Sequence, residues 1–226
     1  MQTRHQNSTI NIFLKWTGLT SLCFAVGLTY YFSSIRPDAL FLTVTFIALG
    51  LLQWSLVLRQ RLNNVVLWTY VTGMGYILSF VVYYMLDQLT RPLWISTGLA
   101  NSTPTIDAVR GVIGGAVIGF SIGIPQWYVV LRINKIRNAA WWIPATVLAY
   151  GIGLGIASLF YTLAKSARWD AFFGGSLNMP VVVLGAVLGS LVIGVITGVT
   201  IAWLLRNHSV EQNVDSAQQL TSTATP

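Results

Sequence analysis

Six stretches of apolar residues, each about as long as a membrane-spanning helix, constrain this chain more than any other feature of its sequence. They cover residues 12–33, 39–58, 65–86, 108–131, 140–163 and 180–205. A helix needs about 20 residues to cross a hydrocarbon core of roughly 30 Å. The period-two alternation of a membrane β-barrel is absent, and helices are the other way to satisfy the backbone in lipid. The sequence therefore predicts an all-α membrane protein with six transmembrane helices.

The composition supports this class, since 54% of the residues are hydrophobic and only 8% are charged. A soluble globule would need more polar surface. The net charge of +7 does not indicate a nucleic-acid partner, because basic residues in membrane proteins set orientation. With a cytoplasmic N-terminus, most of the basic residues fall on the inside: Arg4, Lys15, Arg59, Arg61, Arg132, Lys135, Arg137 and Arg206. We therefore predict a multi-pass protein of the cell membrane with both termini cytoplasmic.

A heptapeptide occurs twice, as Gln-Trp-Ser-Leu-Val-Leu-Arg at 53–59 and Gln-Trp-Tyr-Val-Val-Leu-Arg at 126–132. Each copy ends an apolar stretch and leads into a short basic loop, and a degenerate third copy lies at 202–206. This repetition predicts three tandem helical hairpins, all in parallel orientation because each repeat crosses the membrane twice. The polar segment 209–226 lacks the apolar content to fold, so we expect a disordered cytoplasmic tail.

The tryptophans gather at the predicted cytoplasmic ends of the helices. An aromatic belt at the membrane interface explains this placement without any ligand. The belt does not explain Gln53 and Gln126, which precede two of the tryptophans and need hydrogen-bond partners in an apolar setting. We hypothesise that the two glutamines hold adjacent hairpins in register, and we include them among the candidate binding residues.

Glycines recur at a spacing of four in one predicted helix and at spacings of four or five in another. The first set is Gly111, Gly115, Gly119 and Gly123, and the second is Gly185, Gly189, Gly194 and Gly198. Such ridges let two backbones approach closely. We expect the 108–131 and 180–205 helices to be central, either packed on each other or forming a homo-oligomer interface. A pore lined by glycine backbone is the competing interpretation.

No catalytic or metal-binding pattern stands out in the sequence. Residues 119–123 match G-x-S-x-G, but that motif acts at a strand-to-helix turn, whereas here it lies inside a predicted helix. The two histidines, His5 and His208, flank the membrane segments, so Ser121 lacks a base within reach. We expect no enzyme activity, no metal and no cofactor, and the lack of a carboxylate at mid-membrane depth argues against proton-coupled transport.

A shallow pocket on the outer side is the remaining candidate site. Asp107 and Arg110 lie three residues apart at the start of the 108–131 helix. Several tyrosines end the odd-numbered helices nearby, namely Tyr30, Tyr31, Tyr83, Tyr84 and Tyr161. We predict that these side chains frame a binding site.

The repeated segments resemble a group of uncharacterised bacterial multi-pass membrane proteins with G-x-x-Q-W-x-V-L-R hairpins. The matching residues are Gly50, Gln53, Trp54, Leu58, Arg59 and Trp68, then Gly123, Gln126, Trp127, Leu131, Arg132 and Trp142. Similar segments also occur as membrane portions attached to cytoplasmic kinase-like domains, so the resemblance implies a sensory or anchoring role in the bacterial inner membrane. We expect a non-enzymatic sensor, scaffold or accessory subunit of a membrane complex, in contact with membrane lipids. The alternative is a small-molecule or lipid transporter or binding protein with a cavity among the hairpins.

Overall fold

The computed structural model describes residues 2–33, 39–59, 62, 66–96, 103–166 and 178–223, which are almost entirely helical. The long helices are α1 (Gln2–Ser33), α2 (Ala39–Gln53), α3 (Val66–Ser96), α4 (Pro104–Pro125), α5 (Trp142–Ser166) and α7 (Met179–Thr223). The short elements are the π-helices η1 (Trp54–Leu58) and η2 (Gln126–Leu131) and the 3₁₀-helix η3 (Ala139–Trp141).

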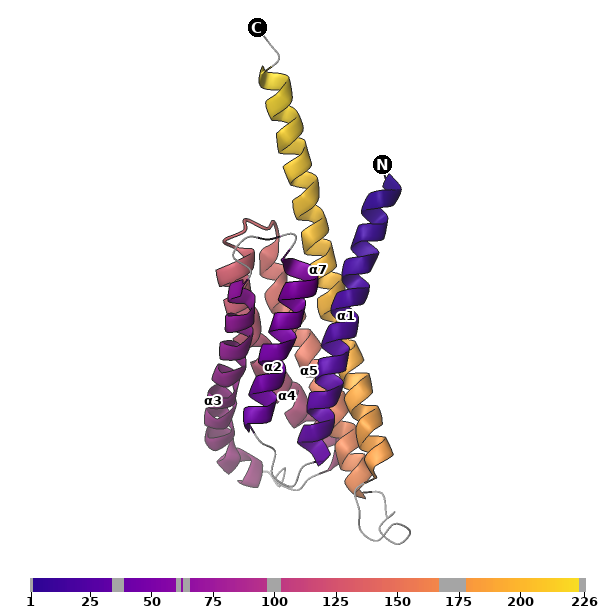
Figure 1. Ribbon diagram of the computed structural model, residues 1–226. Coiled ribbons are helices and arrows are strands. Elements are labelled where there is room, and N and C mark those ends of the chain that lie inside the picture. Colours follow the sequence, from indigo (N-terminus) through magenta and orange to yellow (C-terminus); the bar gives the residue numbers. More distant parts are fainter. Residues whose placement is uncertain are drawn as a thin grey trace.

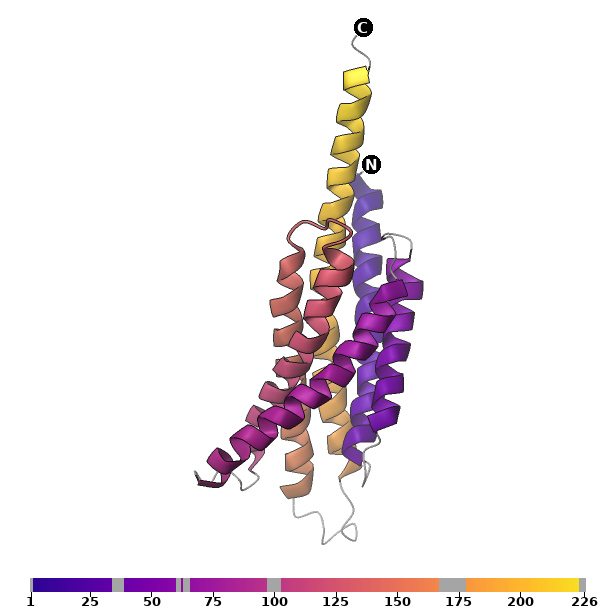
Figure 2. The same ribbon diagram turned by 90° about the vertical axis from the view of Figure 1, so that its left-hand side faces the viewer.

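The helices run up and down in a bundle, and both termini lie at the same end of it (Figure 1). We call this the terminal end and the other the distal end. Each helix packs on the next in the order α1, α2, α3, α4, α5 and α7, and α7 returns to pack on α1. The bundle is therefore a closed ring of six helices. Figure 2 shows α3 inclined across it, with its C-terminal half diverging from α2 toward the distal end.

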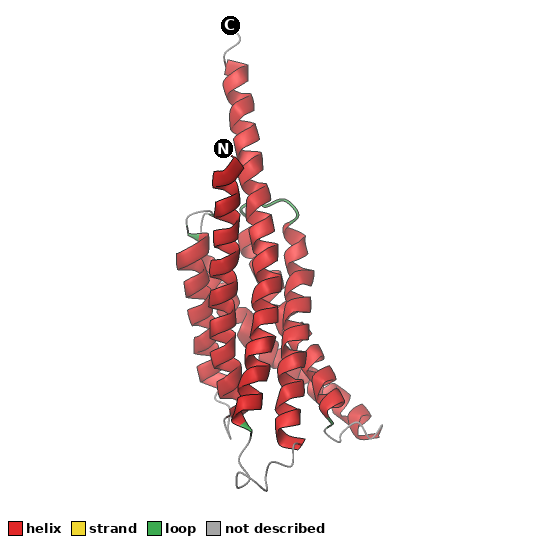
Figure 3. Ribbon diagram, turned by 90° about the vertical axis from the view of Figure 1, so that its right-hand side faces the viewer, coloured by secondary structure: helices red, strands yellow, loops and turns green. Residues whose placement is uncertain are grey.

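Five helical segments are long and apolar enough to cross a membrane: Thr9–Phe32, Val66–Pro92, Pro104–Leu131, Ala139–Lys165 and Met179–His208. A sixth apolar segment, Thr43–Leu58, is shorter. Helices make up nearly all of the described part of the chain, and no strand lies in it (Figure 3), which confirms the predicted all-helical membrane class.

Several helix ends differ from the predicted ones. The helix α1 begins at Gln2 rather than near residue 12, and α3 continues to Ser96. The helix α7 extends to Thr223, where we expected a disordered tail from residue 209. No glycine or proline lies between Gly198 and Pro226, so nothing in this segment breaks a helix that has already begun. Polar composition alone therefore did not predict where this helix ends.

The two copies of the heptapeptide fold in the same way. The backbone N–H of Arg59 donates to the carbonyl of Trp54 at 2.9 Å, and that of Arg132 donates to the carbonyl of Trp127 at 2.8 Å. Both bonds span five residues, the signature of a π-turn. Each guanidinium carbon also lies over the indole of its own copy, 6.0 Å and 5.8 Å from the ring centroid.

The glycine ridges pack on neighbours other than the one we expected. On α4, a Cβ atom at Gly115 would meet the backbone of Tyr150 in α5, and Gly111, Gly119 and Gly123 also face α5. On α7, Gly185 and Gly189 face α5, whereas Gly194 and Gly198 face α1. Of the two arrangements we expected, direct packing of these helices on each other is therefore wrong, because α5 lies between them in the ring. The homo-oligomer interface stays a prediction.

Candidate functional site

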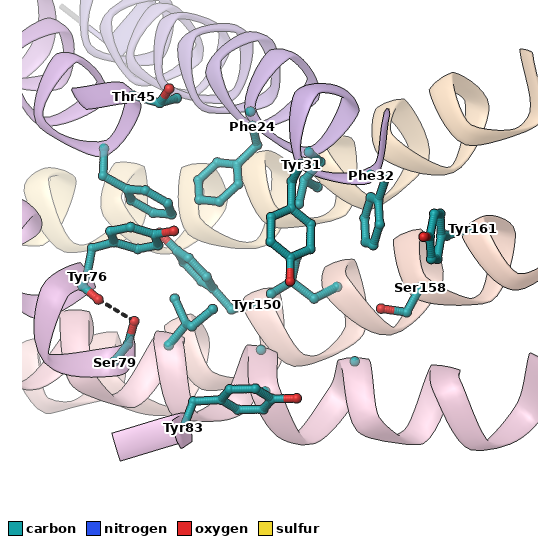
Figure 4. A pocket seen from close by; sticks show the side chains of 18 of the residues that line it. Phe24, Tyr31, Phe32, Thr45, Tyr76, Ser79, Tyr83, Tyr150, Ser158 and Tyr161 are labelled. Carbon is teal, nitrogen blue, oxygen red and sulfur yellow. Dashed lines mark hydrogen bonds between the residues drawn. The ribbon is translucent and has the colours of Figure 1, made fainter. Parts of the chain in front are cut away.

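A cavity of about 560 Å³ opens within the ring, toward the distal end. Side chains from α1, α2, α3, α4 and α5 line it, and Figure 4 shows aromatic rings from several of these helices facing one another across the space. This volume lies within the roughly 300–1,000 Å³ range of pockets that hold one small ligand. The cavity is thus large enough to be a binding site.

Aromatic rings line the deep part of the cavity. The rings of Phe46 and Tyr76 stack with centroids 3.8 Å apart. Phe24 contacts Phe46 edge to face at 5.0 Å and Tyr150 at 5.2 Å. The four rings are buried and come from α1, α2, α3 and α5, so the deep wall is apolar and rigid.

Polar and charged groups gather at the mouth. Thr103 caps the N-terminus of α4, because its hydroxyl accepts a hydrogen bond from the backbone N–H of Ile106. Beyond this cap, Asp107 Oδ1 lies 3.5 Å from Arg110 Nη1, and Asp107 Oδ2 accepts the hydroxyl of Thr162 at 2.7 Å. The bond from α5 to α4 holds the carboxylate at a fixed height in the cavity wall.

One stripe of α5 connects the mouth to the deep wall. Its members, spaced by three or four residues, are Tyr150, Leu154, Ser158, Tyr161 and Lys165. At 1.5 Å per residue, the stripe from Tyr150 to Lys165 is about 22 Å long. The Nζ atom of Lys165 lies 4.5 Å from the ring centroid of Tyr161 at the open end. A ligand along this stripe would place an apolar body below and a polar group at the rim.

Glycines of α4 give the cavity part of its width. Gly111, Gly114 and Gly115 line it, and a Cβ atom at Gly114 would lie 3.0 Å from Cε2 of Tyr83. Larger residues here would fill space between α4 and α3. The glycine-rich sequence of α4 therefore serves two faces, one packed on α5 and one open to the cavity.

Three tryptophans close the bundle toward the terminal end. Trp16, Trp68 and Trp142 are each at most 2% exposed. Their ring centroids lie 5.6, 5.9 and 5.6 Å apart, which makes a triangle with one indole from each of α1, α3 and α5. A cavity of about 10 Å³ lies beside them, too small for an organic ligand. The tryptophan triangle lies outside the lining of the large cavity, on its terminal side.

Gln53 connects the tryptophan triangle to a neighbouring helix through two buried hydrogen bonds. Its side-chain oxygen accepts the indole N–H of Trp68 at 2.9 Å, and its amide nitrogen donates to the hydroxyl of Thr20 at 3.1 Å. One residue at the end of α2 thus connects α1 and α3.

Gln126 makes the same pair of bonds at the start of η2, directly after α4. Its oxygen accepts the indole N–H of Trp142 at 2.9 Å, and its nitrogen donates to Thr72 at 2.8 Å. At the third corner, the indole of Trp16 donates to the hydroxyl of Thr197 at 3.1 Å, so a threonine of α7 replaces the glutamine. Both glutamines lie below the large cavity and outside its lining.

The structure brings together only part of the predicted outer site. Asp107 and Arg110 line the mouth, as do three of the tyrosines: Tyr31, Tyr83 and Tyr161. Tyr30 instead packs on Phe41, with centroids 3.9 Å apart, and Tyr84 is 65% exposed. The aromatic deep wall was not predicted, because its residues come from four helices and share no sequence spacing.

The aromatic belt accounts for fewer tryptophans than we predicted. Trp141 and Trp203 are 63% and 40% exposed, as a belt requires, whereas the three indoles of the triangle are core residues. Burial is tolerated because each indole N–H has an acceptor inside the bundle. A sequence signal existed, since a threonine follows each of these tryptophans by four residues: Thr20, Thr72 and Thr146.

The residues considered for catalysis are not arranged for it. Ser121 is 6% exposed within α4, and its carbonyl oxygen faces Gly75 of α3. Within the described ranges, no three His, Cys, Asp or Glu side chains lie close enough to hold a metal ion.

Comparisons with protein-family models, with curated proteins and with solved structures gave no match. The fold and the site therefore define the class by themselves. This is a helical membrane protein whose ring of six helices encloses a cavity open at one end.

Proposed function

We propose that this protein binds an amphipathic small molecule or lipid within the membrane, in the cavity enclosed by its three hairpins. The observation that carries the proposal is the cavity of about 560 Å³, with an aromatic deep wall and charged side chains at its mouth. Protein interiors normally pack without voids much larger than a water molecule. A bundle that served only as a scaffold would have no need of this space.

The orientation follows from the distribution of basic residues, with the terminal end in the cytoplasm. In this arrangement all six helices cross the membrane as three tandem hairpins, and the cavity opens toward the outer leaflet. Phe80 and Tyr83 line the cavity and are each 40% exposed, on the part of α3 that diverges from α2 (Figure 2). A lipid-soluble ligand could enter sideways at this position.

The test is to fill the cavity from within. Leu154 faces the cavity and Ile152, on the same helix, is 45% exposed on the outside. We expect Leu154→Trp to lose the lipids that co-purify with the wild-type protein, measured by native mass spectrometry and lipid extraction. Ile152→Trp is the matched control and should retain them. If both variants carry the same bound molecules as the wild type, the cavity is not the binding site.

A sensor, scaffold or accessory subunit is the second candidate, and the length of α7 favours it. This helix projects beyond the bundle at the terminal end (Figure 1), where a partner in the cytoplasm could contact it. A homo-oligomer or a membrane complex would be consistent with this role, and no catalysis is required for it. Pull-down from native membranes separates the candidates, since a stoichiometric protein partner favours the sensor or scaffold and bound lipid favours the binding protein.

A further inference from the structure

The charged mouth of the cavity indicates what kind of head group it receives. Three charged side chains line the cavity within the described ranges: Asp107, Arg110 and Lys165. Two are cations and one is an anion. The Asp107 carboxylate is already engaged, with one oxygen toward Arg110 and the other accepting the hydroxyl of Thr162. It acts as part of the wall, which leaves a mouth of net positive charge.

The two cations have the donors that an anion needs. The guanidinium of Arg110 has a planar fork of N–H groups that matches a carboxylate or a phosphate. Lys165 is exposed, lines the same cavity as Arg110 and lies three residues beyond Thr162 on α5. The two donors come from different helices, so one small anionic group between them would contact both α4 and α5.

A cationic head group fits the deep wall less well than an apolar chain does. An aromatic cage binds a quaternary ammonium ion through open ring faces. Here Phe46 and Tyr76 stack face to face, and Phe24 points its ring edgewise at its neighbours. These rings contact one another rather than surround an empty position. They suit an apolar chain lying along them.

Resting on the proposed function, we infer that the ligand is a single-chain amphiphile with an anionic head group, a carboxylate or a phosphate. The head lies between Arg110 and Lys165, and the chain follows the α5 stripe toward Tyr150. The stripe of about 22 Å is longer than half of a roughly 30 Å hydrocarbon core, so the chain would extend past the membrane midplane.

Four ligands with the same sixteen-carbon chain test the head group: palmitate, hexadecyl phosphate, hexadecanol and hexadecyltrimethylammonium. Equilibrium binding of the tritiated compounds is measured with the full chain in phosphatidylcholine nanodiscs, against nanodiscs that contain Leu154→Trp. We expect both anions to bind more tightly than the alcohol and the cation. Whichever of the two anions binds more tightly then shows whether the natural head group is the carboxylate of a free fatty acid or a lipid phosphate.

Removal of one mouth cation is the second arm. We expect Lys165→Gln to raise the Kd of palmitate and hexadecyl phosphate about tenfold, the effect of losing one hydrogen bond to a charged group, and to leave hexadecanol unchanged. Arg91→Gln is the matched control, because it removes an exposed cation of α3 that does not line the cavity.

Two results would overturn the inference. In the first, the alcohol or the cation binds the wild type as tightly as the anions do. In the second, Lys165→Gln leaves the Kd of both anions unchanged. If Leu154→Trp still abolishes binding in either case, the cavity remains a binding site and only the anionic head group is wrong. If no compound binds the wild type better than Leu154→Trp, the proposed function fails as well.

Discussion

At the scale of single residues, Gln53 and Gln126 explain how an apolar bundle fixes the register of its helices. Apolar contacts between membrane helices tolerate sliding, since lipid tails are as apolar as the side chains. A primary amide that accepts from an indole on one helix and donates to a hydroxyl on another tolerates little sliding. Each glutamine does both within 3.1 Å, so each fixes three helices at one height.

We expect the double variant Gln53→Leu, Gln126→Leu to lower the free energy of unfolding by about 2 kcal/mol, since it removes four buried hydrogen bonds worth roughly 0.6 kcal/mol each in a membrane bundle. Thermal unfolding in detergent, followed by tryptophan fluorescence, measures the change. Tyr128→Leu, at a position 56% exposed, is the control and should leave the midpoint unchanged. An unaltered midpoint in the double variant would sink the register hypothesis.

The same residues show what sequence reasoning could and could not reach. The unusual placement of glutamine before tryptophan identified a polar group in need of partners, which the structure supplies. The identity of those partners depends on which helices become neighbours. No local sequence pattern predicts the order of the helices in the ring. The prediction that all these tryptophans form an interface belt was wrong for a related reason. Interface and core positions at the same height differ only by rotation about the helix axis.

At the scale of elements, the contact between α4 and α5 is set by missing side chains. Gly111, Gly115, Gly119 and Gly123 form a groove into which the α5 backbone fits, with Gly115 against Tyr150. The sequence predicted this close approach correctly and its partner wrongly. A spacing of four marks a face of α4 but contains no information about which helix occupies it.

The glycine face predicts opposite effects for one substitution at two positions. We expect Gly115→Ala to destabilise the fold, because its Cβ atom would overlap the backbone of Tyr150 and force α4 away from α5. Gly18→Ala should be neutral or stabilising by up to about 1 kcal/mol, since nothing lies within 4 Å of its Cβ position and alanine favours helix. Expression level and the thermal midpoint in detergent report both effects. A stable Gly115→Ala protein with the wild-type midpoint would contradict this packing.

The π-turns could not be predicted from the sequence either. Each adds a residue to its turn and thereby rotates the rest of the helix, which places the arginine of the heptapeptide over its own tryptophan. No residue type demands this geometry. It arises where the glutamine must face the interior and the arginine must leave the bundle, so it depends on the tertiary fold.

At the scale of the whole molecule, closure of the ring depends on the contact between its first and last helices. The hydroxyl of Thr17 donates to the carbonyl of Gly194 at 3.1 Å, and that of Ser21 donates to the carbonyl of Ser190 at 3.2 Å. These bonds join α1 to α7 along the face where Gly194 and Gly198 leave room. They close the ring around a cavity whose own lining comes from α1 to α5.

The number of crossings decides whether the two termini lie on the same side of the membrane. Thr43–Leu58 is the shortest apolar segment, but the continuous helix from Ala39 to Leu58 would span about 30 Å at 1.5 Å per residue, enough for a hydrocarbon core. Because α2 also packs between α1 and α3, we predict that it crosses the membrane with them. An even number of crossings then leaves both termini on the same side of the membrane, which the distribution of basic residues predicts to be the cytoplasm.

Two measurements test this topology. A split fluorescent-protein strand fused to either terminus should give fluorescence with a cytoplasmic partner fragment, since six crossings return the chain to its starting side. In a Cys23→Ser background, Thr105→Cys at the distal end should react with an impermeant maleimide on intact cells, and Ile133→Cys should react only after permeabilisation. Fluorescence from one terminus alone would mean that α2 does not cross, and labelling of Ile133→Cys on intact cells would place the cavity mouth in the cytoplasmic leaflet.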